Sequence, residues 1–162
     1  MYKQQLLDSL QREIFLLKQI APLIEEKDLD YRPVEKMRST IELMQYLSGI
    51  GAVMLRWFVK NDLNPEEWGK IREYRKTLTR ENFKERLDEQ MEQIVKYMDM
   101  ISEEDLFKKE VELPWKEKMV LGNAIINCPV KWLASYRMQL FTYLKMNGRP
   151  DISTKEAWHV QM

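Results

Sequence analysis

The residue types that most often carry nucleophilic or metal chemistry are scarce in this sequence. Its 162 residues include a single cysteine, Cys128, and a single histidine, His159. If a helix restarts at Pro129, Cys128 lies near a helix N-terminus, where the pKa of a thiol falls and the reactive thiolate forms. No histidine base accompanies this cysteine, so we expect a buried, inert thiol. His159 alone makes no site, and we expect it to be exposed in a C-terminal tail.

The charge pattern excludes several classes of partner. The 26 Lys and Arg residues balance 26 Asp and Glu residues, giving a formal net charge of 0. This balance argues against nucleic-acid binding, which needs a basic surface. A basic cluster over residues 70–76 is interrupted by Glu73, and we predict a solvated helix face there rather than an RNA-binding surface. The balanced charge and the interrupted cluster both favour a protein that does not bind nucleic acid.

The sequence also predicts where the protein resides. It contains no run of about 18 apolar residues that would span a membrane. The first residues lead into charged amphipathic sequence, unlike the apolar core of a signal peptide. A single cysteine cannot form an internal disulfide, which favours a reducing compartment. We therefore predict a cytoplasmic protein without membrane contact.

Apolar residues recur at spacings of three and four in four long segments, which is typical of helices with one core face. The chain has only 5 Gly and 6 Pro residues, and few turn residues favour long elements. We predict one all-α domain over residues 1–162, a four-helix bundle with a long crossover between helices two and three. Its expected parts are a first helix and turn over 1–26, helix two over 39–60, a short helix over 65–76, helix three over 79–101, helix four over 117–147 and a tail over 149–162.

Local signals set several of these boundaries. Ser39 and Glu42 form a capping box that starts helix two. Asn64 followed by Pro65 is a strong start signal for the short helix. Pro129 lies inside the expected helix four, where it removes a backbone hydrogen bond, so we predict a kink there or a restart with Cys128 as the cap.

The second half of helix two predicts a partner. Its apolar residues lie almost all round the helix, so it must be covered on two sides. A second copy of the chain is one such cover, and we predict a homodimer through this helix. The residues concerned are Ile50, Val53, Leu55, Trp57 and Val59.

Two stretches resemble a known family. Residues 30–47 resemble the junction between the first two helices of the DinB/YfiT-like family. Leu113-Pro114-Trp115, followed by residues 136–144 and Gly148, looks like that family's fourth helix. Helix number, helix order and the long crossover also fit, so the resemblance covers nearly the whole chain. It implies a DinB-like four-helix bundle.

The resemblance also implies a divalent metal such as zinc or nickel at one end of the bundle. Typical members hold it with three histidines, one on helix two and two on helix four at positions i and i+4. The matching positions here are Tyr46, Trp132 and Tyr136. Tryptophan is not a metal ligand, and neutral tyrosines with a pKa of roughly 10 are poor ones. We therefore predict a degenerate metal site with no metal and no other cofactor.

Two interpretations of these aromatic residues stay open. Tyr46, Trp132 and Tyr136 either line a small-ligand pocket, with Glu42 and Arg137 as supports, or simply fill the space left by the histidines. Arg137 either orients a carboxylate or forms a structural ion pair, for which Glu42 is the expected partner. We predict a metal-free protein that binds a small ligand or a partner, and we lean against an enzyme. The alternative is a thiol-transferase or hydrolase-type enzyme that uses a divergent site.

Overall fold

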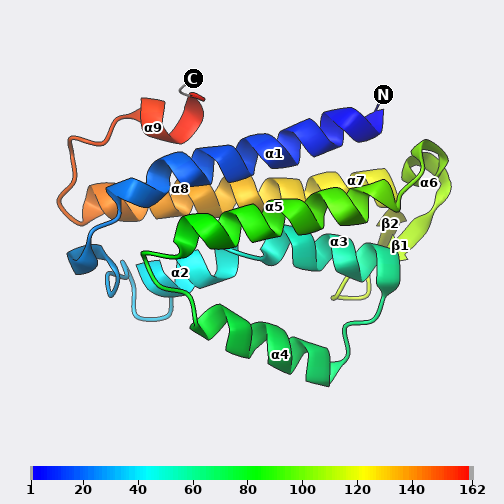
Figure 1. Ribbon diagram of the computed structural model, residues 1–162, viewed down its shortest axis with the longest axis horizontal. Helices are drawn as coiled ribbons and strands as arrows, with labels where there is room; N and C mark the ends of the chain where they lie inside the picture. Colours follow the sequence, from blue (N-terminus) through cyan, green and yellow to red (C-terminus); the bar gives the residue numbers. More distant parts are fainter. Residues whose placement is uncertain (1, 161–162) are drawn as a thin grey trace.

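The computed structural model describes residues 2–160, which are mostly helical (Figure 1). The helices and strands are α1 (Tyr2–Ile20), α2 (Thr40–Leu47), α3 (Ile50–Lys60), α4 (Pro65–Lys76), α5 (Phe83–Asp99), α6 (Glu103–Lys108), β1 (Glu110–Glu112), β2 (Lys118–Val120), α7 (Leu121–Ile125), α8 (Lys131–Met146) and α9 (Thr154–Trp158). Two short 3-10 helices, η1 (Ala21–Leu23) and η2 (Glu26–Asp28), follow α1, and a π-helical turn, η3 (Ile126–Val130), joins α7 to α8.

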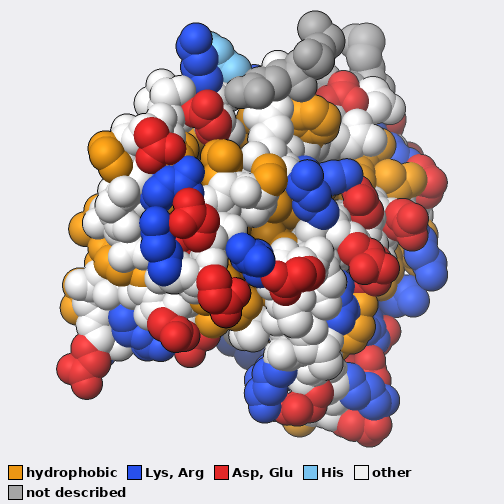
Figure 2. Space-filling view, turned by 60° about the vertical axis from the view of Figure 1, so that its left-hand side comes forward, with side chains coloured by type: hydrophobic (Ala, Val, Ile, Leu, Met, Phe, Trp, Pro, Cys, Tyr) orange, Lys and Arg blue, Asp and Glu red, His pale blue; other side chains and the backbone are white. Residues whose placement is uncertain are grey.

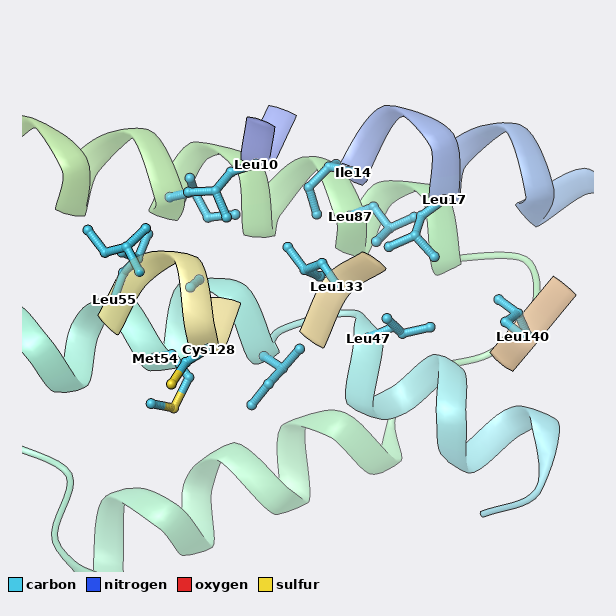
Figure 3. Close-up of a cluster of buried hydrophobic side chains, with 14 of the residues drawn as sticks. Leu10, Ile14, Leu17, Leu47, Met54, Leu55, Leu87, Cys128, Leu133 and Leu140 are labelled. Atoms are coloured by element: carbon cyan, nitrogen blue, oxygen red, sulfur yellow. The ribbon is translucent and has the colours of Figure 1, made fainter. Parts of the chain in front are cut away.

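Four long rods form the bundle: α1, α2 with α3, α5, and α7 with η3 and α8. The first rod packs against α5 and α8, and α3 packs against α5 and η3. Each rod contributes a stripe of fully buried leucines to one core (Figure 3). The predicted all-α four-helix architecture is confirmed. The leucines include Leu10, Leu17, Leu55, Leu87 and Leu133.

The predicted helix over 39–60 is wrong in one respect, because the structure breaks it into α2 and α3 at Ser48 and Gly49. Its start is as predicted, with both hydrogen bonds of the capping box between Ser39 and Glu42 present. The break is bridged by Gln90 of α5, which is 2% exposed. Its side-chain oxygen accepts from Gly51 N at 2.8 Å, and its amide nitrogen donates to the Leu47 carbonyl at 2.8 Å. In a continuous helix, Gly51 N–H would donate to the Leu47 carbonyl. The Gln90 side chain bonds both of these groups instead.

The fourth rod begins later than the predicted residue 117. Residues 118–120 form β2, which pairs antiparallel with β1 so that Val111 lies opposite Met119. The predicted helix restart with Cys128 as the cap is wrong, because the helix continues through Cys128 and Pro129. Instead the helix passes through η3, whose wider turn accommodates a residue that lacks a backbone N–H. Cys128 is fully buried there, close to Met54 (Figure 3).

Two further boundaries differ from the sequence prediction. Helix three begins at Phe83 rather than at 79, because Thr79 and Asn82 bond each other's backbone N–H in a turn. The predicted tail over 149–162 contains α9, which is capped by Ser153 and Glu156. The helix packs on α1 and α8. Met1 of the predicted first segment and residues 161–162 of the tail lie outside the described residues.

The apolar residues that suggested a dimer are covered largely within the chain. Ile50, Val53 and Leu55 are buried, and Trp57 and Val59 are half-buried. The indole nitrogen of Trp57 donates to the Glu112 carbonyl of β1 at 2.7 Å. Neighbouring elements of the same chain therefore provide the second cover that we assigned to a partner. The homodimer stays a prediction. Light scattering, which measures the molar mass in solution, would test it.

Helix α4 lies outside the bundle, along α2 and α3 (Figure 1). It begins and ends as predicted, and it contains no buried residue. It is attached to the bundle through side chains such as Glu67, which bonds Arg56 of α3 at 2.8 Å. Figure 2 shows Lys and Arg side chains interspersed with Asp and Glu on one face of the molecule. Within the described residues, none of the helices has the length and apolar character needed to cross a membrane.

The bridge across the helix break predicts a large cost for its removal. Replacing Gln90 with Leu leaves the Gly51 N–H and the Leu47 carbonyl buried without partners, and each such group costs about 1–3 kcal/mol. We expect Gln90→Leu to lower the free energy of unfolding by about 2 kcal/mol or more in urea denaturation. Gln93→Leu, at an exposed position of the same helix, is the control and should change it by less than about 0.5 kcal/mol. Equal effects of the two variants would contradict the role of the bridge.

Candidate functional site

Tyr46 of α2 lies close to two guanidinium groups. The guanidinium carbon of Arg38 is 4.3 Å from the centre of the Tyr46 ring, and that of Arg75 is 5.3 Å from it. The ring also meets Tyr136 of α8 edge-on, with 5.0 Å between ring centres. Burial, and then the neighbouring Tyr136, raise the pKa of Tyr46 to about 12. The phenol is therefore protonated at neutral pH and can donate a hydrogen bond.

A cleft of about 520 Å³ opens beside Tyr46, between the loop 32–38, α2 and α4. We call it the basic cleft, because six of its lining residues carry positive charge and only Glu35 and Glu42 carry negative charge. Such a surplus is unexpected in a chain whose net charge is 0. The six cations are Arg32, Lys36, Arg38, Arg72, Arg75 and Lys76.

Glu42 lies at the rim of the basic cleft and is already engaged. Its carboxylate accepts from the Ser39 backbone N–H at 2.7 Å and pairs with Arg32 at 3.2 Å. These contacts, with the Ser39 hydrogen bond as the largest cause, hold the pKa of Glu42 below its ordinary value of 4.5. The carboxylate therefore stabilises the start of α2 and neutralises little of the remaining positive charge.

The expected ion pair between Arg137 and Glu42 is wrong. Arg137 is 1% exposed and faces α1 and α9 instead. Its Nε donates to Glu13 of α1 at 2.7 Å, another of its N–H groups donates to the Ala157 carbonyl, and its guanidinium lies 5.0 Å from the Trp158 ring. Although it follows Tyr136 in sequence, it points to another face of α8. It holds α9 against the bundle and does not reach the basic cleft.

The three aromatic positions separate in space. Tyr46 and Tyr136 touch, whereas Trp132 packs against Trp115 of the turn between β1 and β2, with 5.9 Å between ring centres. Tyr46 lines the basic cleft, and neither Trp132 nor Tyr136 does. Both of these half-buried residues pack against the core.

Neither Cys128 nor His159 lines the basic cleft. Burial raises the pKa of the Cys128 thiol to about 11, opposite to the lowered pKa that a nucleophilic cysteine needs. His159 is exposed beyond α9, where its backbone carbonyl accepts from Gln19 at 2.7 Å.

The sequence prediction missed Arg75. The cluster over 70–76 was expected to be a solvated helix face, which is correct for the exposed Arg72 and Lys76 but wrong for the half-buried Arg75. Its Nε and Nη2 atoms are buried and have no hydrogen-bond partner. Burial lowers the pKa of this guanidinium. The basic cluster was the available signal, but helical spacing alone does not tell which of its residues turns toward α2.

The residues at the position implied for the family's metal do not fit a divalent cation. An indole is no ligand, and the phenol of Tyr46, with a pKa of about 12, keeps its proton. Arg38 and Arg75 beside Tyr46 would repel a cation. Across residues 2–160, no three His, Cys, Asp or Glu side chains gather into a group that would hold a metal ion.

Comparison with known proteins identifies the fold. No protein-family model and no curated protein matches the chain. A crystal structure from Exiguobacterium sibiricum, assigned provisionally to the DinB family, superposes with a TM-score of 0.74 at 21% identity. The match covers 96% of this chain and 97% of that one. The predicted DinB-like fold is therefore confirmed.

The Glu42 carboxylate predicts a pH-dependent contribution to stability. Because its folded-state pKa lies below 4.5, its contribution is present above the unfolded-state pKa and is lost as the pH falls through the folded-state value. Glu42→Gln keeps the hydrogen-bonding shape but removes the charge at the helix N-terminus. We expect it to cost about 0.5 kcal/mol at pH 7, and this difference should vanish in acid. Urea denaturation from pH 7 to pH 3 measures it; a difference that grows in acid would contradict the assignment.

The pair of Arg137 with Glu13 predicts a second effect on stability. Glu13→Ala leaves the buried guanidinium without its acidic partner, which typically costs roughly 3 kcal/mol. We also expect α9 to loosen, so that trypsin cleaves after Lys155 faster than in the original protein. Glu92→Ala, which removes an exposed acid of α5, is the matched control for both measurements. Unchanged cleavage would show that Arg137 does not hold α9.

Proposed function

We propose that this chain is a metal-free relative of the DinB-like proteins that binds a small multivalent anion in the basic cleft. The observation that supports it is the gathering of six cations and two acids around one cavity of about 520 Å³. Glu42 is one of those acids, and it is already paired with Arg32 at 3.2 Å. An anion with clustered oxygen atoms, such as a pyrophosphate or a polycarboxylate, complements this surplus of charge.

The positions of the cations suit such a ligand. Arg38 is held over Tyr46 and, at 5.6 Å, over Tyr136, so its guanidinium is oriented before a ligand arrives. Arg75 reaches the same cleft from α4. Arg72 and Lys76 lie one helical turn apart on α4 and line the same cleft. Cations from separate segments thus converge, which favours a compact anion over an extended surface partner.

Glu73 competes only weakly with a ligand for Lys76. Lys76 contacts Glu73 at 2.7 Å, and both side chains are about two-thirds exposed or more. Ion pairs between exposed side chains contribute only about 0–1 kcal/mol, so a ligand can displace Glu73 at little cost. Tyr46, protonated at neutral pH, supplies a neutral donor at the edge of the cleft. The thiol-transferase or hydrolase alternative stays a prediction for which residues 2–160 offer no supporting constellation.

The proposal is tested by calorimetric titration with sodium pyrophosphate at low ionic strength. Arg72→Ala combined with Lys76→Ala removes two exposed cations of the cleft, and we expect affinity to fall tenfold or more because each charge-assisted hydrogen bond contributes roughly 1.5 kcal/mol. Added salt should weaken binding to the original protein. Lys84→Ala combined with Lys96→Ala removes two exposed cations from α5 and is the control. If the two double variants lose affinity equally, or if pyrophosphate does not bind, the proposed function is wrong.

A further inference from the structure

A second cavity, of about 240 Å³, lies between α3, α4 and α5. We call it the inner cavity. Part of its wall is apolar and comes from Ala52 and Val53 of α3 and Ile71 of α4. Besides Arg56 of α3, the guanidinium groups of Arg75 on α4 and Arg86 on α5 also line it. Arg75 lines the basic cleft as well, so it stands between the two spaces.

Arg75 and Arg86 carry hydrogen-bond donors that have no partner in the protein. The atoms are Nε and Nη2 of Arg75 and Nη1 of Arg86. Within residues 2–160 they are the complete set of buried side-chain nitrogen and oxygen atoms without a hydrogen-bond partner. A buried donor that forms no bond costs free energy, and most for a charged group. That all three belong to residues around one cavity indicates a ligand with acceptor atoms.

Other charged groups around the inner cavity are bound to one another. Arg56 donates to Asp62 and, at 2.8 Å, to Glu67. Glu89 accepts a hydrogen bond from the hydroxyl of Tyr74. The carboxylates of Glu67 and Glu89 therefore already accept hydrogen bonds from protein groups.

The remaining charges are positive. Among residues 2–160, Arg75 forms no ion pair with an acid, and the Nη1 of Arg86 lies 3.6 Å from the Glu89 carboxylate, beyond hydrogen-bond distance. Arg86 is held in place by stacking on Tyr74, with 3.6 Å between its guanidinium carbon and the ring centre, and by a bond to Thr77. A single negative charge on the ligand complements this surplus.

The geometry of the unsatisfied atoms favours a carboxylate. Elsewhere in this chain, arginine binds carboxylates through the same pair of atoms. Arg56 holds the two oxygens of Asp62 with Nε and Nη2 at 2.8 and 2.9 Å, and Arg149 holds those of Asp151 at 3.1 Å each. Nε and Nη2 form the side of the guanidinium that donates two parallel hydrogen bonds. In Arg75 this side has no partner.

We propose that the inner cavity binds a small monocarboxylate with an apolar body. The carboxylate would accept from Nε and Nη2 of Arg75 and from Nη1 of Arg86, and the body would lie against Ala52, Val53 and Ile71. An apolar cavity of roughly 150 Å³ holds benzene, so 240 Å³ accommodates an aromatic ring together with its carboxylate. This site goes beyond the function proposed for the basic cleft and shares only Arg75 with it.

The test uses sodium benzoate as the probe and benzamide as its neutral counterpart, titrated into the full chain and followed by calorimetry. Benzoate should bind with a stoichiometry of one, and benzamide at least tenfold more weakly. Arg86→Met removes one unsatisfied donor but keeps an apolar stem, and should weaken benzoate tenfold or more. Ile71→Trp fills the cavity from a helix without buried residues, keeps every charge, and should abolish benzoate binding.

The variants separate this site from the basic cleft. Arg86 and Ile71 do not line the cleft, so Arg86→Met and Ile71→Trp should keep the pyrophosphate affinity of the original protein, which also shows that they fold. Arg72→Ala combined with Lys76→Ala should keep benzoate binding. Equal binding of benzoate and benzamide, unchanged benzoate binding by Ile71→Trp, or absence of benzoate binding at millimolar concentration would overturn the proposal. Loss of benzoate only in the Arg72 and Lys76 variant would place the probe in the cleft and also overturn it.

Discussion

The broken second helix depends on one buried amide. A helix that stops and restarts inside a bundle leaves backbone groups without partners, and in a core these groups must be bonded. Gln90 supplies both a donor and an acceptor there, from a helix 39 positions away along the chain from Gly51. Gly51 is suited to its place, since a Cβ there would lie 3.0 Å from Leu133 and 3.2 Å from the Gln90 side-chain oxygen. The absence of a side chain lets α3 approach α5 and α8 closely enough for the amide to reach.

The same break positions the charged residues. Arg75 lies against it, with its Nε 3.9 Å from where a Cβ of Gly49 would be. Helix α4 contains no buried residue. Its Arg72, Arg75 and Lys76 line the basic cleft. Its Glu67 and Tyr74 attach it to Arg56 of α3 and Glu89 of α5. A net charge of 0 for the whole chain therefore coexists with a strong local surplus. Composition describes the sum of the charges, whereas binding depends on where each charge lies.

Features coded by neighbouring residues could be predicted from the sequence, and features that join distant residues could not. Capping residues lie within three positions of their partners, so the starts of α2 and α4 were predictable. The break at Gly49 needs Gln90, and the ion pair of Arg137 with Glu13 joins residues 124 positions apart, so neither has a local signal. At the candidate site, the resemblance grouped Tyr46 with Tyr136, which touch, and with Trp132, which packs against Trp115 instead. It contained no information on Arg75. That residue is distinguished from Arg72 only by the direction in which α4 presents it.

Two arginines lie beside Tyr46, and their charge favours an anion over a cation at this position. Three neutral imidazoles offer lone pairs to a cation, whereas two guanidinium groups offer only N–H donors and positive charge. In the inner cavity, a carboxylate would satisfy the buried donors of Arg75 that the folded protein leaves unpaired. Because such a ligand binds the folded chain and not the unfolded one, its binding free energy adds to stability. Arg75 is half-buried, and its unpaired donors cost free energy in the free protein. A carboxylate that accepts from these donors recovers that cost on binding.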